Sequence, residues 1–246
     1  EKGNFKLVGL DDEFEDKLLS MACEAAEKIY EQFMSDMPDV ISLEHKEQLE
    51  FSERILARYS RPLFLLELMI HTSRGFLADD INKEMESEKT DEVFCKVLNG
   101  LHARGCQVAN EILVLLKNGF ADGADARWRC LHEIAVTTNF IAEQGSSVAK
   151  RYADHCAVTS YRKAKDHNDS CSRFGYPSVP QNEVDRLKRE HDAAIQEHGE
   201  DFAGCSSYGW IPTNIISTRN FKELEKAVEL DNLRTHYKAA CENLHA

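Results

Sequence analysis

The chain has 246 residues, of which 42% are hydrophobic and 30% are charged, and its net charge is -13. This length can bury a sizeable core without disulfides, and the composition excludes long disordered or collagen-like tracts. The acidity argues against non-specific attachment to nucleic acid or to anionic membranes, although residues 121–170 are close to balanced and leave room for a local basic groove.

The cysteines and the chain ends bear on where the protein works. The eight cysteines occur singly, with no Cys-x-x-Cys pair, so we expect reduced thiols and a cytoplasmic location. No apolar run approaches the roughly 20 residues of a membrane span, and we predict no membrane partner. The chain starts without methionine and stops inside a helical pattern, so we expect further domains of a longer parent chain.

Residues 1–88 form an acidic region with helical periodicity. Apolar residues recur every three or four positions over 11–35 and again over 43–59, and Pro38 lies in the interruption between them. A third helix is predicted over 63–85. We therefore expect two helices, a break at the proline, and one more helix before the next region.

Residues 89–246 are predicted to form a second helical region, packed with the first as one globular unit. Asn220 is a candidate N-cap, and no stretch alternates with the period of two that strands require. The fold expected is all-α, a multi-helix bundle with long central antiparallel helices and no sheet. The predicted helices span 90–118, 121–144, 148–168, 182–198 and 231 to the end.

The central helix, 121–144, carries polar residues among large apolar ones that face more than one side. Such a helix is buried, and buried charges cost several kcal/mol unless they are paired. Arg129 and Glu133 lie about 40° apart and can touch, whereas Arg127 and His132 lie about 140° apart. Arg129 and Glu133 are thus either an intrahelical ion pair or a site pair. Arg127 is solvated or faces a phosphate, and His132 is a core histidine or a catalytic one.

Two other helices supply candidate binding residues. Tyr152 and His155 share one face of the helix over 148–168, and Tyr237 and His245 share one face of the last helix. We interpret Tyr152, His155 and Tyr237 as candidate binding residues and His245 as a candidate catalytic residue. The scattered cysteines and histidines lack the spacing of zinc ligands, so we predict no metal and no cofactor.

Four pieces of sequence carry a resemblance to a known family. They are LVLLKNG at 113–119, the run Arg127-Trp128-Arg129-x-x-x-Glu133, the turn Tyr208-Gly209-Trp210, and the closing LRTHYKAACENLHA. In this order they resemble a bacterial family catalogued only as domain of unknown function 5677, from about Lys89 to the end of the chain. The resemblance implies a helical fold without a settled activity, and it makes His245 the more characteristic histidine.

A second resemblance is to the HEPN superfamily, helical domains that often act as metal-independent ribonucleases through an Arg-x(4 to 6)-His motif. Arg127 and His132 have that spacing. The resemblance implies RNA as substrate, a toxin or phage-defence role, and a homodimer with the central helices close together. His132 or His245 would then serve as general acid or base, and Arg127 and Arg129 would stabilise charge on the phosphate.

Three functions are therefore open at the level of sequence. The first, which we narrowly favour because polar residues on a buried helix need a reason and the HEPN resemblance supplies one, is a metal-independent endoribonuclease. The second is a non-catalytic interaction or sensing module of a larger protein, in which the arginines and glutamate form a structural ion network. The third is a pocket in the helical bundle where the arginines bind a small anionic ligand.

Overall fold

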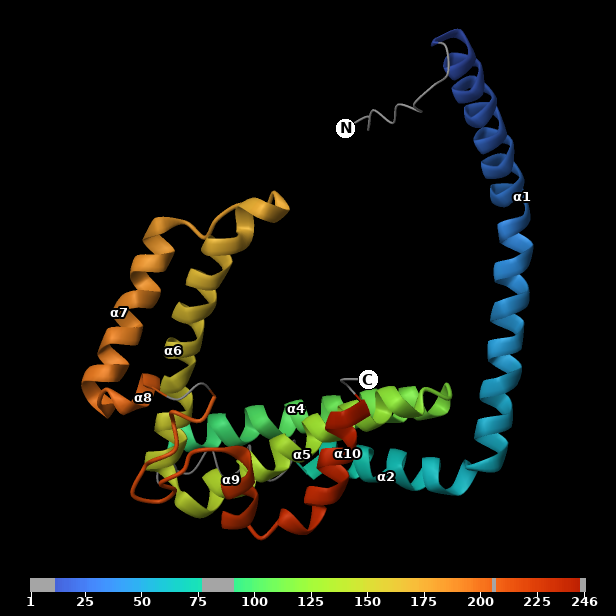
Figure 1. The fold of residues 1–246 in the computed structure, drawn as a ribbon. Helices are drawn as coiled ribbons and strands as arrows, with labels where there is room; N and C mark the ends of the chain where they lie inside the picture. Colours follow the sequence, from blue (N-terminus) through green and yellow to red (C-terminus); the bar gives the residue numbers. More distant parts are fainter. Residues whose placement is uncertain (1–11, 77–90, 205–206, 244–246) are drawn as a thin grey trace. The chain divides into compact units, whose positions relative to one another are not determined.

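A computed structural model describes residues 12–76, 91–204 and 207–243, which form helices joined by turns and contain no strand (Figure 1). The predicted all-α class is confirmed. The chain divides into two compact units, Glu1–Arg58 and Tyr59–Ala246. None of the described helices is long and apolar enough to cross a membrane.

The first unit holds one long helix, α1 (Asp12–Arg58), with Pro38 inside it. The predicted break between two helices is therefore wrong. Proline removes a single backbone donor from a helix interior, which kinks or weakens a helix but does not have to end one that continues on both sides. Large apolar side chains such as Phe14, Ile29 and Phe33 are exposed along α1.

The second unit starts with α2 (Ser60–Phe76), followed by α4 (Glu92–Lys117) and α5 (Ala121–Gln144). The remainder of the helix predicted over 63–85 lies outside the described residues. Asp91 caps α4 by accepting hydrogen bonds from the backbone N–H groups of Val93 and Phe94, and these bonds lower the pKa of its carboxyl. A short turn reverses the chain, so α4 and α5 lie side by side as the predicted antiparallel pair.

Gly145 separates α5 from α6 (Ser146–Ser170) and has a φ of 80°, a conformation that side chains rarely adopt. After η2 (Cys171–Phe174), α7 (Gln181–His198) returns along α6, and the two lie side by side in Figure 1. The short α8 (Asp201–Gly204) follows and brings Phe202 into the core.

The last elements close the second unit over α5. They are α9 (Phe221–Ala227), η3 (Asp231–Leu233) and α10 (Arg234–Asn243). Asn220 caps α9, as predicted, because its side-chain oxygen accepts a hydrogen bond of 3.0 Å from the N–H of Glu223. Both α9 and α10 pack on α5, which is thus covered by α4 on one side and by the closing helices on another. Fully buried members of this core include Phe140, Ile141, Phe202, Ile211 and Leu224.

Candidate functional site

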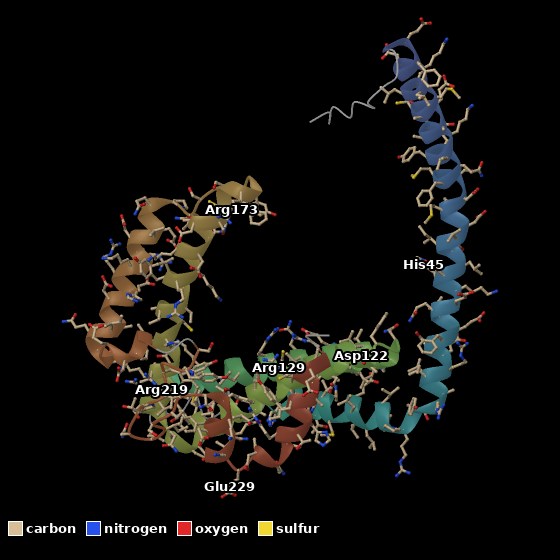
Figure 2. All side chains as sticks on the ribbon, in the orientation of Figure 1. His45, Asp122, Arg129, Arg173, Arg219 and Glu229 are labelled. Carbon is tan, nitrogen blue, oxygen red and sulfur yellow. The ribbon has the colours of Figure 1, made fainter. Side chains whose placement is uncertain are left out.

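The polar residues of α5 do not form one site, and the first group lies where α10 crosses α5. Arg129, labelled in Figure 2, places its Nε 3.1 Å from Glu133 Oε1 and 3.3 Å from the Tyr237 hydroxyl. That hydroxyl donates a hydrogen bond of 2.6 Å to the same carboxylate oxygen. We call these three residues the Arg129 cluster. The helical spacing anticipated the contact between arginine and glutamate, and the fold adds the tyrosine from α10.

Arg129 and Tyr237 both have raised pKa values in the Arg129 cluster. The Arg129 and Glu133 side chains are 29% and 36% exposed, whereas Tyr237 is buried. The hydrogen bond with Tyr237 raises the pKa of Arg129, and burial, followed by the hydrogen bond to Glu133, raises the pKa of Tyr237. The guanidinium therefore stays charged and the hydroxyl stays a donor at neutral pH.

His132 belongs to a second and more deeply buried group. It is 4% exposed, its ring is stacked on Trp128 with the centroids 5.5 Å apart, and its Nε2 lies 2.8 Å from Glu225 Oε1. Glu225 is fully buried, and its other oxygen accepts a hydrogen bond of 2.6 Å from Arg234. We call His132, Glu225 and Arg234 the Glu225 cluster. A histidine enclosed in this way is positioned to hold the core together rather than to reach a phosphodiester in solvent.

Sequence reasoning missed Glu225. The residue stands in the run KELEKA, whose charges are typical of a solvated helix face. No local pattern distinguishes it from the neighbouring Glu223, because its burial depends on contacts with α5 and α10, which come from distant parts of the chain.

Arg127 points to a third place. It forms an ion pair with Glu111 of α4, and its Nη1 lies 3.8 Å from the Cys130 sulfur. Its Nε is buried and has no hydrogen-bond partner among the residues that the structure describes. His245, the remaining catalytic candidate, lies outside the described residues. Of the predicted catalytic set, only Arg129 and Glu133 are therefore seen together.

A pocket of about 330 Å³ opens beside Glu133, and we call it the Glu133 pocket. Tyr152, a predicted binding residue, lines it and meets the Trp210 ring edge to face, with the centroids 5.1 Å apart. Burial, followed by the negative charge of Glu133, raises the pKa of Tyr208 to about 12. The residues that give the pocket its aromatic and charged character are Arg104, Glu133, Tyr152, Tyr208, Trp210 and Phe221.

His155 does not join Tyr152 in that pocket. It is 5% exposed and packs edge to face on Phe202, with the centroids 5.2 Å apart. Burial lowers the pKa of His155, and the positive charges of Arg162, Arg151 and Arg219 lower it further. The predicted binding pair of α6 is therefore divided between two environments.

One group among the described residues has the composition of a metal site, namely Asp154, Glu197 and His198. The amino group of Lys150 lies 2.7 Å from a carboxylate oxygen of Asp154 and 2.7 Å from one of Glu197. His198 Nε2 lies 2.7 Å from the same Asp154 oxygen. The positive charge that these carboxylates require thus comes from a lysine.

The two raised tyrosine pKa values predict a specific dependence of stability on pH. A tyrosine pKa that is higher in the folded state than in the unfolded state, where it is near 10, contributes stability that is present below about pH 10 and is lost as pH rises through the folded value. We expect the free energy of unfolding, measured with denaturant from pH 9 to 12, to fall less steeply in Tyr237→Phe than in the wild type. The difference has an upper limit of about 1.4 kcal/mol per pH unit, reduced by solvent screening.

The control for this titration is Tyr176→Phe, because Tyr176 is 64% exposed. Its pH profile should match that of the wild type. Lysines also lose protons in this pH range, but all three proteins contain the same lysines, so their contribution to the slope cancels in the comparison. Equal slopes for Tyr237→Phe and the wild type would show that Tyr237 titrates as it does in the unfolded chain.

Comparison with known proteins identifies the second unit. A family model described as "Family of unknown function (DUF5677)" matches residues 96–246, a segment that starts in α4 and includes the Arg129 cluster, the Glu225 cluster and the Glu133 pocket. Searches among curated proteins and among solved structures gave no match. The match covers more than half of the chain and agrees with the family that the four sequence pieces resemble. The chain belongs to the DUF5677 family.

Proposed function

We propose that this protein binds a small anionic ligand in the Glu133 pocket and works as a non-catalytic binding or sensing module. The observation that carries the proposal is the make-up of the pocket, which combines aromatic walls with one arginine and one glutamate in about 330 Å³. Small-molecule sites have volumes from about 300 Å³ and are mostly apolar with a few placed polar groups.

The charges of the pocket suggest what the ligand contains. Glu133 already accepts hydrogen bonds from Arg129 and Tyr237, so its charge is largely satisfied. Arg104 Nη1 lies 3.9 Å from Glu111 Oε1, and the Arg104 side chain is 49% exposed. Its guanidinium group is therefore accessible to an anion. A planar ring packed on the aromatic wall, together with a phosphate or carboxylate at Arg104, matches these groups. Nucleotide-like compounds have this combination.

The second candidate function is a metal-independent endoribonuclease, with RNA as substrate, a homodimer as the active form and a role in phage defence. The observation in its favour is that Arg129 is partly exposed beside Tyr237, which places a fixed positive charge near the surface of α10. This candidate depends on His245, because His132 is occupied by Glu225 in the core. A cytoplasmic location suits either candidate, since the described cysteines are free thiols.

Ligand-observed NMR on the whole chain tests the binding proposal. Adenosine and uridine monophosphates are the probes, and only the part of their binding that Arg104→Gln weakens is assigned to the Glu133 pocket. We expect the nucleotides to bind, with affinity about tenfold weaker in Arg104→Gln because a charge-assisted hydrogen bond is lost. Arg189→Gln, which removes an exposed arginine from α7, should leave the affinity unchanged.

Incubation of the same proteins with RNA in the presence of EDTA decides between the two candidates. Cleavage that disappears in Arg129→Gln and His245→Ala, at an unchanged unfolding midpoint, would establish the nuclease and replace the binding proposal. Intact RNA together with nucleotide binding that Arg104→Gln weakens supports the module. If neither nucleotide binds, the assignment of the Glu133 pocket as a ligand site is wrong.

A further inference from the structure

A second cavity, of about 400 Å³, lies between the start of α6, the junction of α7 with α8, and the segment before α9. We call it the arginine cavity. It shares no lining residue with the Glu133 pocket, and the kind of ligand that it suits is inferred from its own residues. The lining residues that matter here are Arg151, His198, Asp201, Thr213, Asn214 and Arg219.

Arg151 is held in place by neutral groups. Its Nε donates a hydrogen bond of 2.9 Å to the carbonyl oxygen of Trp210, and its guanidinium lies 5.1 Å from the centroid of the Phe202 ring. Burial, followed by the positive charge of Arg219, lowers the pKa of Arg151. Within the described part of the chain, Arg151 forms no ion pair with a carboxylate. The guanidinium of Arg151 is therefore held in a fixed position without a carboxylate as its direct partner.

Arg219, labelled in Figure 2, is anchored in the same manner. Its Nη1 donates hydrogen bonds to the carbonyl oxygens of Asp201, at 2.9 Å, and Gly209, at 3.2 Å. Within residues 12–76, 91–204 and 207–243, no carboxylate lies within ion-pair distance of it. By contrast, Arg127, Arg129 and Arg234 of the same unit each pair with a glutamate. Two like charges fixed beside one cavity repel each other, and among the described residues the nearby carboxylates of Glu200 and Asp201 form no ion pair with either arginine.

A buried histidine and two carboxylates complete the surroundings of the arginine cavity. His155 is 5% exposed, and its Nε2 has no hydrogen-bond partner among the described residues. Burial lowers the pKa of His155, and the positive charges of Arg162, Arg151 and Arg219 lower it further, so the ring stays neutral beside these guanidinium groups. The carboxylate groups of Glu200 and Asp201 also line the cavity, and their negative charges oppose the binding of an anion there.

We propose that the arginine cavity binds the phosphate group of a small phosphomonoester. Guanidinium groups match phosphate oxygens with paired, charge-assisted hydrogen bonds, and the backbone anchors hold both arginines ready for that geometry. The exposed side chains of Thr213 and Asn214 provide further donors at the rim. A volume of about 400 Å³ has room for an organic group attached to the phosphate.

The test is a titration of the isotope-labelled whole chain with inorganic phosphate and with glycerol phosphate, each against sodium chloride at equal ionic strength. Backbone amide NMR signals of Gly199, Thr213 and Asn214 report binding. We expect both phosphates to shift these signals, with tighter binding of the phosphomonoester. Arg219→Gln should weaken binding at least about tenfold.

Two further variants keep the test decisive. Asp201→Asn removes a negative charge from the cavity and keeps both arginines, so we expect it to tighten phosphate binding severalfold. Arg189→Gln removes an exposed charge elsewhere on α7 and should have no effect. If Arg219→Gln does not fold, Asp201→Asn still decides the question. No phosphate-dependent shift in the wild type, or an affinity unchanged or weakened by Asp201→Asn, would overturn the proposal, and preference for inorganic phosphate would rule out the phosphomonoester.

Discussion

Replacing Glu225 by alanine should destabilise the second unit by about 3–5 kcal/mol, the loss typical of breaking a buried ion pair from one side. Glu225 is fully buried and is the shared acceptor for His132 and Arg234. Without it, Arg234 keeps its charge in a partly buried position, and His132 loses its partner at a 4% exposed site. The change also leaves a cavity next to His132 at a fully buried position.

Chemical denaturation measures this loss, and Glu223→Ala is the matched control. Glu223 is on the same helix, two residues earlier, and its contact with Lys226 lies at the surface. We expect its effect to be much smaller than that of Glu225→Ala. A conservative variant, Glu225→Gln, keeps an acceptor but loses the charge and should fall between the two. Similar losses in Glu223→Ala and Glu225→Ala would mean that Glu225 is not the centre of a buried network.

Gly209→Ala is expected to be the most damaging addition of a single methyl group. A Cβ atom at Gly209 would lie 2.0 Å from the Phe202 carbonyl oxygen and 2.7 Å from His155 Nε2. The Phe202 oxygen belongs to the backbone, so the backbone itself would have to move. This movement would break the hydrogen bond that Arg219 donates to the Gly209 carbonyl oxygen. A loss of about 3 kcal/mol or more is expected from overpacking of this kind.

The control for this substitution has the opposite sign. A Cβ atom at Gly100, on the exposed face of α4, would have nothing within 4 Å. Gly100→Ala should therefore raise the free energy of unfolding by about 0.5–1 kcal/mol, because alanine favours the helix over the unfolded chain. Thermal and denaturant unfolding of both variants separate the effects. A Gly209→Ala protein as stable as the wild type would show that α8 and the Tyr208–Trp210 turn can move apart at little cost.

Local sequence was sufficient for the helices whose ends have their own chemical signals. The apolar period defines α4 and α5, and the predicted cap at Asn220 acts within three residues. The contact of Arg129 with Glu133 follows from helical geometry alone, because residues four apart are neighbours on one face. These interactions join residues that are at most four positions apart, so the local sequence is enough to predict them.

The remaining features depend on contacts between distant segments. Tyr237 meets Glu133 across 104 positions of sequence, and Glu225 meets His132 across 93. The arginine cavity depends on the fold placing Arg151 next to Arg219, which no periodicity anticipates. The prediction at Pro38 was wrong for the converse reason, since a local breaker was outweighed by the helix on either side.

Trp210 links the two proposed sites through a single residue. Its ring forms part of the wall of the Glu133 pocket, while its carbonyl oxygen holds Arg151 at the arginine cavity. A ligand in the Glu133 pocket that displaced Trp210 would thus move the hydrogen-bond acceptor of Arg151 and change the free energy of phosphate binding at the arginine cavity. Such coupling is reciprocal: the factor by which phosphate changes the affinity of the Glu133 pocket equals the factor by which the pocket's ligand changes the affinity for phosphate.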